Sequence, residues 1–204
     1  YSDALFRRGE LQFEAGDYVA AAASYRAVVE LGDIAPVYEQ SLYKLGWSQF
    51  RQEHYEQGLA SFFALLDRKL PAGAAPEARI AALAPAEQEQ LADVFRAISL
   101  SFSYLGSNTE VRDYYATRGA RSYEPLIYAK LAALHLTKER YTDAAEIFQT
   151  FVSNNPVHRQ APAFQMRVID AFQAGKFPTL VLQGKKDFVD RYNLQGEYWQ
   201  HHDK

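Results

Sequence analysis

The chain has 204 residues, of which 48% are hydrophobic and 23% charged, with a net charge of −3. This composition is that of a folded globular chain, and the absence of cysteine excludes disulfides, thiolate catalysis and cysteine-based zinc sites. No Lys/Arg run is present to follow a phosphate backbone, and no apolar run reaches the ~18 residues of a membrane span, so neither nucleic acid nor a membrane-spanning segment is expected.

Helical periodicity dominates the chain from end to end, and the strand signal is weak throughout. In chain order, the predicted helices cover residues 2–15, 18–32, 36–52, 55–69, 87–106, 108–118, 124–138, 141–154, 161–174 and 178–192. The sequence therefore predicts an all-α fold.

Local signals mark several of the predicted helix starts. Four prolines, Pro36, Pro125, Pro162 and Pro178, stand where a helix begins, and proline suits a first turn because its missing N–H has no partner there. Asp17 is the expected N-cap of helix 18–32. Ser107 with Glu110 has the spacing of a capping box.

The same arrangement of small and aromatic residues occurs three times. Leu42, Leu45, Gly46, Phe50, Tyr55 and Phe62 follow a pattern seen about 37 positions earlier in Gly9, Phe13, Gly16, Tyr18, Ala21 and Tyr25. It returns in Tyr128, Leu131, Ala132, Leu136, Tyr141, Ala144, Phe148 and Pro156. A small residue in each copy is expected where two helices touch, so a larger side chain there would push the helices apart.

These residues resemble the tetratricopeptide repeat (TPR) family, with Glu53 in place of the glycine that the family has at that position. The resemblance implies a right-handed α-solenoid of about five helix pairs, in which stacked repeats share a continuous core. It also predicts a division into repeats 1 and 2 (1–69), an inserted loop or short helix (70–86), repeats 3 to 5 (87–192) and a C-terminal tail (193–204). The charged helix 178–192 is expected to cap the last repeat.

No catalytic motif is recognisable, so we expect neither an enzyme nor a protein that needs a cofactor or metal. His135 occupies a position typical of packed side chains and is interpreted as a core residue. His201 and His202 would need further ligands to bind a metal.

The resemblance also predicts where a partner binds, because the first helix of each TPR pair lines a concave groove. The corresponding side chains are Phe6, Glu10, Gln40, Tyr43, Trp47, Arg96 and Gln165. Aromatic anchors at the N-terminal end of such a groove suit a peptide or protein partner. The basic clamp for a terminal carboxylate is absent, because Phe6 and Glu10 stand at its first positions.

Three functions are therefore considered: a non-catalytic scaffold for a protein partner, a structural spacer or oligomerisation module in which Tyr198 and Trp199 meet another domain, and an enzyme or ligand carrier with a deep pocket. The stretches 36–50 and 188–199 are similar to TPR proteins of the bacterial cell envelope, namely the outer-membrane assembly lipoprotein, the Tol–Pal coordinator and TonB-associated proteins. This similarity predicts the periplasm or envelope of a Gram-negative bacterium, with the cytoplasm as the alternative. Because the chain opens with Tyr and has no signal peptide, we expect it to be a piece of a longer protein. The partner and the oligomeric state stay open.

Overall fold

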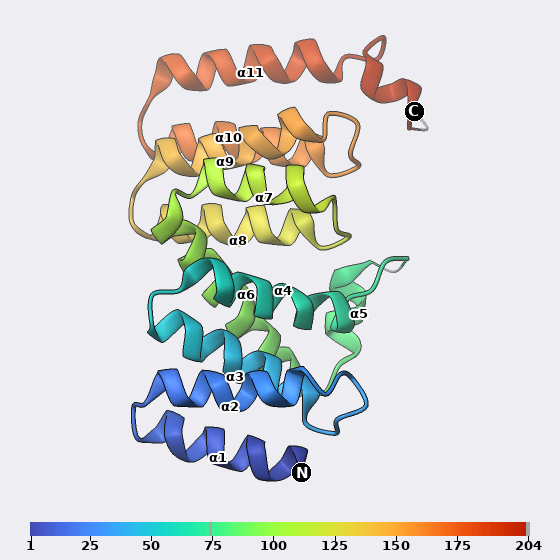
Figure 1. The fold of residues 1–204 in the computed structure, drawn as a ribbon. Helices are drawn as coiled ribbons and strands as arrows, with labels where there is room; N and C mark the ends of the chain where they lie inside the picture. The colour runs from blue at the N-terminus through green and yellow to red at the C-terminus, as the bar shows by residue number, and fades with distance from the viewer. Residues whose placement is uncertain (74, 203–204) are drawn as a thin grey trace. The chain divides into compact units, whose positions relative to one another are not determined.

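The protein is helical throughout the part of the chain that the structure describes. The structure is a computed structural model that describes residues 1–73 and 75–202 (Figure 1). Its helices are α1 (Ser2–Glu14), α2 (Tyr18–Val29), α3 (Tyr38–Arg51), α4 (Tyr55–Lys69), α5 (Pro76–Ala82), α6 (Pro85–Leu105), α7 (Asn108–Arg118), α8 (Glu124–Thr137), α9 (Tyr141–Asn154), α10 (Ala161–Ala174) and α11 (Pro178–Tyr192). A short 3-10 helix, η1 (Glu197–Gln200), follows. The predicted all-α class is confirmed.

The helices fall into two compact units, which we describe separately. The first, Tyr1–Leu105, contains the packed pairs α1/α2 and α3/α4, with α6 packed on α4 and α3. The second begins at Gly106 and contains the pairs α8/α9 and α10/α11, with α7 packed on α9. The helices predicted as a third pair, 87–106 and 108–118, correspond to α6 and α7 and belong to different units.

Small residues let the two helices of a pair approach closely. A Cβ placed on Gly9 of α1 would lie 2.7 Å from the ring of Tyr25 on α2, and one on Gly46 of α3 would lie 2.6 Å from the ring of Phe62 on α4. Both rings are fully buried. Since carbon atoms normally approach no closer than about 3.5 Å, only glycine fits at these two positions without a shift of the ring. As expected, these two glycines therefore lie where the paired helices touch.

A left-handed residue ends the first helix of each pair. In all four pairs its N–H bonds to a carbonyl three residues back, and the next N–H bonds five residues back, which is the Schellman motif. These residues are Gly16, Glu53, Glu139 and Lys176, with φ between +57° and +79°. The motif turns the chain sharply into the second helix even where glycine is replaced.

The predicted helix starts agree with the structure at several places and fail at two. Asp17 caps α2, since its carboxylate accepts a hydrogen bond from the Ala20 N–H at 3.0 Å. Prolines lie in the first turns of α8, α10 and α11. Pro36 instead precedes α3, which begins at Tyr38. The capping box of Ser107 and Glu110 is wrong, because the Ser107 hydroxyl makes no cap bond and contacts His135 instead.

The stretch expected to interrupt the repeats contains α5, between α4 and α6. Pro76 is buried at its start, whereas Glu77, Ala78 and Arg79 are exposed. Ala74, within the predicted insertion 70–86, lies outside the described residues, as do residues 203 and 204 of the predicted tail.

The second unit has an aromatic core that extends into the C-terminal segment. Phe151 of α9 lies 4.2 Å from Phe164 of α10, measured between ring centroids. Tyr198 of η1 packs against Tyr192 and donates a hydrogen bond to the Arg159 carbonyl at 3.2 Å. The Trp199 indole N–H donates to the Tyr192 carbonyl. Tyr198 is therefore buried within its own unit and Trp199 is half-buried, so Tyr198 is not available for the contact with another domain that the spacer hypothesis assumes.

Helix α11 differs from a fully polar cap. It carries the expected charged residues, but Leu182 is 57% exposed and Val189 is 64% exposed. These two side chains leave an apolar stripe on the last helix of the second unit.

Candidate functional site

Three helices of the first unit are linked side by side through polar side chains. Lys44 of α3 forms an ion pair with Glu10 of α1 at 2.9 Å. Tyr43, also on α3, donates a hydrogen bond to Asp93 of α6 at 2.7 Å. We call the surface that these helices share the α1–α3–α6 face. It carries two grooves, and most of the predicted binding residues lie on it.

The first groove lies along α1 and has a volume of about 700 Å³. Its lining consists of Asp3, Phe6, Arg7, Glu10, Leu11, Glu14 and Val37. Phe6 is half-buried against Tyr25, and the Tyr25 hydroxyl donates to Glu10 at 2.6 Å. Burial disfavours the Glu10 carboxylate, but hydrogen bonds from Tyr25 and Lys44 outweigh it and lower the pKa. The groove thus combines an ionised carboxylate, paired with Lys44, with an apolar wall.

The second groove lies along α6 and has a volume of about 620 Å³. Its lining consists of Tyr43, Ala86, Glu89, Gln90, Ala92, Asp93 and Arg96. Arg96 donates to Asp93 from Nε at 3.1 Å, and its guanidinium lies over the Trp47 ring, 5.7 Å from the centroid. Burial and the bond to Asp93 raise the pKa of Tyr43 to about 12, so this phenol stays protonated at neutral pH. The polar groups of the groove therefore hold one another in place.

Trp47 contributes more to packing than an open binding anchor would. Its ring meets Phe50 edge-on at 5.3 Å and the buried Phe62 at 5.8 Å. Only part of the indole reaches the surface, where Arg96 covers it. Truncating Trp47 would consequently disturb the α3/α4 pair as well as the face.

Two predicted residues lie elsewhere. Gln40 is exposed near the start of α3, outside the linings of both grooves. Gln165 belongs to the second unit and is only 2% exposed, because α10 packs between α9 and α11. Its side chain cannot contact a partner without movement of these helices. The structure thus brings Phe6, Glu10, Tyr43, Trp47 and Arg96 onto one face and leaves the other two apart.

Sequence reasoning missed Glu89 and Asp93 of α6. The register of the third repeat is hard to derive from the sequence, because α6 extends over 21 residues. The spacing of Asp93 and Arg96 by three residues was the available signal, since residues so spaced are neighbours on a helix surface.

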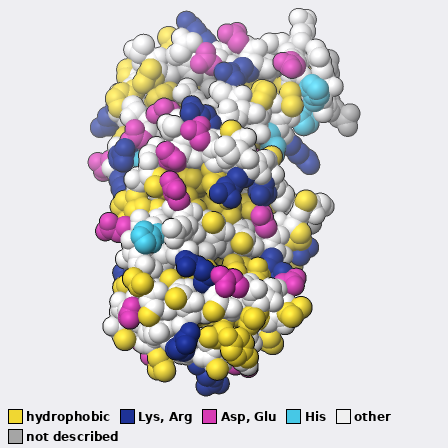
Figure 2. Space-filling view, viewed as in Figure 1, with side chains coloured by type: hydrophobic (Ala, Val, Ile, Leu, Met, Phe, Trp, Pro, Cys, Tyr) yellow, Lys and Arg dark blue, Asp and Glu magenta, His cyan; other side chains and the backbone are white. Residues whose placement is uncertain are grey.

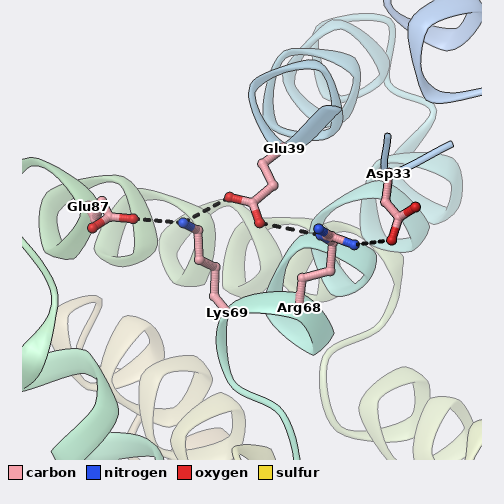
Figure 3. Close-up of polar contacts among 5 residues, drawn as sticks. All are labelled: Asp33, Glu39, Arg68, Lys69 and Glu87. Atoms are coloured by element: carbon pink, nitrogen blue, oxygen red, sulfur yellow. Dashed lines mark hydrogen bonds and ion pairs between the residues drawn. The ribbon is translucent and has the colours of Figure 1, made fainter. Parts of the chain in front are cut away.

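A second polar cluster joins the ends of three helices in the same unit. As Figure 3 shows, Lys69 at the end of α4 lies between Glu39 of α3, at 2.8 Å, and Glu87 of α6, at 2.7 Å. Arg68 pairs with Glu39 at 3.3 Å and with Asp33 at 3.2 Å.

The five residues, Asp33, Glu39, Arg68, Lys69 and Glu87, form what we call the ion-pair cluster. Burial opposes ionisation of Glu39, yet bonds from Lys69 and Arg68 lower its pKa. Acidic groups near helix starts and basic groups near a helix end also complement the helix dipoles. The cluster therefore fixes α4 against α3 and α6.

In the second unit, a serine, a histidine and a carboxylate lie next to one another in space. Ser107 Oγ lies 2.9 Å from His135 Nε2, and His135 Nδ1 lies 3.9 Å from the Asp143 carboxylate. The last distance exceeds a hydrogen bond, and the His135 side chain is 1% exposed. A working general base would need a closer orienting carboxylate and access to substrate. The arrangement is better described as a buried joint between α7 and α8, and the interpretation of His135 as a packed residue agrees with its burial.

Within the part of the chain that the structure describes, the remaining features do not point to a second candidate site. Among residues 1–73 and 75–202, no helix is long and apolar enough to cross a bilayer, and no group of three or more metal-ligating side chains gathers. On the faces visible in Figure 2, Lys and Arg side chains are interspersed with Asp and Glu. The α1–α3–α6 face is thus the best candidate for recognition.

Comparison with known proteins places this geometry in context. Residues 1–36, which contain α1 and α2, match the family model of the tetratricopeptide repeat. No curated protein matches the chain. Among solved structures, the chain is similar to a tetratricopeptide repeat protein from Parabacteroides merdae ATCC 43184, with 15% identity and a TM-score of 0.32. That match covers 93% of this chain and 79% of the other.

Proposed function

Because residues 1–36 are a tetratricopeptide repeat, we propose that the protein is a non-catalytic scaffold that binds a protein or peptide partner on its α1–α3–α6 face. Repeats of this family generally mediate contacts between proteins. The observation that carries the proposal is the side-by-side placement of two grooves on α1, α3 and α6. Tyr43, Asp93 and Arg96 of the second groove are oriented by their mutual hydrogen bonds before binding, which reduces the entropy cost of association.

Affinity capture from the native host, followed by mass spectrometry, tests the proposal. Leu11 and Gln90 are chosen for substitution, because each lines one of the two grooves and Leu11, at 68% exposed, lies outside the core. Leu11→Ala together with Gln90→Ala should reduce capture of the specific partner at least several-fold. Val19→Ala, at a site on α2 that is 69% exposed and outside both linings, is the matched control and should leave capture unchanged. Equal capture by all three proteins, with unchanged circular dichroism, would rule out this face.

A second candidate function is an oligomerisation or spacer module. The observation that favours it is the apolar stripe of α11, where Leu182 and Val189 are exposed. Light scattering of the purified chain distinguishes the two functions. A dimer that dissociates on Leu182→Gln with Val189→Gln would support oligomerisation, and a monomer across the micromolar range would oppose it.

We also propose a location in the periplasm or cell envelope of a Gram-negative bacterium. The support is the similarity of residues 36–50 and 188–199 to envelope TPR proteins. Fractionation of the native host with an antibody against this chain tests the location. Recovery with cytoplasmic markers would contradict it.

A further inference from the structure

The charges of the α1–α3–α6 face are unequal. Its two grooves are lined by five carboxylates and two guanidinium groups. The carboxylates are Asp3, Glu10, Glu14, Glu89 and Asp93, and the guanidinium groups are Arg7 and Arg96. A surface with such an excess attracts cationic groups and repels anionic ones.

Internal pairing removes only part of this excess. Lys44 neutralises Glu10, and Arg96 neutralises Asp93. Among the residues that the structure describes, the other three carboxylates, Asp3, Glu14 and Glu89, have no ion-pair partner. Arg7 is the remaining cation in the linings, so each groove retains negative charge that a partner can neutralise.

Apolar surface accompanies these charges in the first groove. Leu11 is 68% exposed, and Phe6 and Val37 are partly exposed beside it. Contact with such side chains contributes hydrophobic free energy, whereas the carboxylates select the sign of the partner's charge. The two kinds of group alternate along α1, at Phe6, Glu10, Leu11 and Glu14.

From this arrangement we infer that the partner presents an extended segment in which Lys or Arg side chains alternate with apolar ones. The inference rests on the proposed function and specifies the class of partner. Three neighbouring helices span about 20–30 Å, and an extended chain rises about 3.3 Å per residue, so a segment of about ten residues covers the face. Its basic side chains meet Asp3, Glu14 and Glu89.

Three fluorescein-labelled peptides of about ten residues provide the probe. All three place Leu or Phe at every second position, and the positions between carry Lys, Gln or Glu. Fluorescence anisotropy with the full chain at low salt should show the Lys peptide binding at least about tenfold more tightly than the Glu peptide, since exposed ion pairs each change Kd by about twofold to fivefold. The preference should shrink as salt rises.

Charge reversal then tests whether the peptides bind at the α1–α3–α6 face. Glu14→Lys with Glu89→Lys should weaken binding of the Lys peptide and strengthen binding of the Glu peptide. Glu30→Lys with Glu56→Lys makes the same change in net charge at exposed sites away from both grooves and should leave the preference intact.

The outcomes separate this inference from the proposed function. Equal binding of the Lys and Glu peptides, no binding of the Lys peptide, or an equal response to both double variants would overturn the basic-partner inference. If native capture still depends on Leu11 and Gln90 in any of these cases, the scaffold function stands and only the class of partner is wrong. If the Lys peptide binds as expected but native capture is unchanged by Leu11→Ala with Gln90→Ala, the proposed function fails while the charge preference holds.

Discussion

Replacing Gly46 by alanine should destabilise the first unit, although alanine is the better helix former. The added Cβ would lie 2.6 Å from Phe62 Cε1 and 2.8 Å from two further ring atoms. A normal carbon–carbon contact is about 3.5 Å or longer, so the ring has to move by about 1 Å. Phe62 is fully buried against Trp47 and has little room to do so.

The expected magnitude combines two opposing effects. Overpacking of this kind lowers the free energy of unfolding by about 1–3 kcal/mol, whereas exchanging glycine for alanine inside a helix raises it by up to about 1 kcal/mol. The free energy of unfolding should therefore fall by about 1–2 kcal/mol. Gly58→Ala is the matched control, because its nearest contact is 3.3 Å, to the Gly46 carbonyl. That change should alter stability by less than about 0.5 kcal/mol.

Urea unfolding followed by tryptophan fluorescence measures the effect. The chain has two tryptophans, so a Trp199→Phe background leaves Trp47 as the reporter of the first unit. In a Phe62→Leu background the smaller side chain gives room, and the cost of Gly46→Ala should drop by about 1 kcal/mol in a double-mutant cycle. If Gly46→Ala proves as stable as its parent, or if the two changes are simply additive, the close contact between position 46 and Phe62 does not limit stability.

Three further predictions concern other features. Glu53→Gly should raise the free energy of unfolding by about 1 kcal/mol, because the φ of +61° at Glu53 is unfavourable for any residue with a Cβ. Urea unfolding measures this, and a lower urea midpoint would contradict the prediction. Lys69→Met should cost up to about 1 kcal/mol, because Glu87 loses its cation and Glu39 keeps only Arg68. Glu87→Gln should recover part of the loss in thermal melts, and full stability of Lys69→Met would contradict a stabilising role of the cluster. Burial, with Arg140 nearby, lowers the pKa of His135 from its ordinary 6.5, so the unfolded chain binds the proton more readily than the folded chain. The second unit should therefore lose stability as pH falls below about 6.5. The melting temperature should depend less on pH in His135→Gln, and the same dependence in both proteins would contradict this role of His135.

Much of the fold was predictable because its signals are local. Proline at helix starts, Asp17 as a cap and an aromatic residue after each turn act within a few residues of the backbone they shape. The Schellman motif explains why the turn between paired helices is kept at Glu53, where the usual glycine is missing. The hydrogen bonds of the turn hold that residue left-handed despite its Cβ.

The candidate site was predictable only where the repeat register was clear. Tyr43 and Trp47 lie partly exposed on α3, where the predicted register of the second repeat puts them. Asp93 was missed, since its partner Tyr43 is remote in sequence and the long helix α6 hides the repeat boundary. Ser107 shows the same limit, because a contact with His135 outweighs the local capping signal.

The ion-pair cluster also determines where the chain tolerates change. Lys69 links the end of α4 directly to α3 and α6, in addition to the connection through α5 that joins α4 to α6 in sequence. Exposed positions there, such as Glu77, offer a place for an epitope tag, a fluorophore or new chain termini. Glu77 thus gives the first unit an attachment point for labelling that lies outside the linings of both grooves.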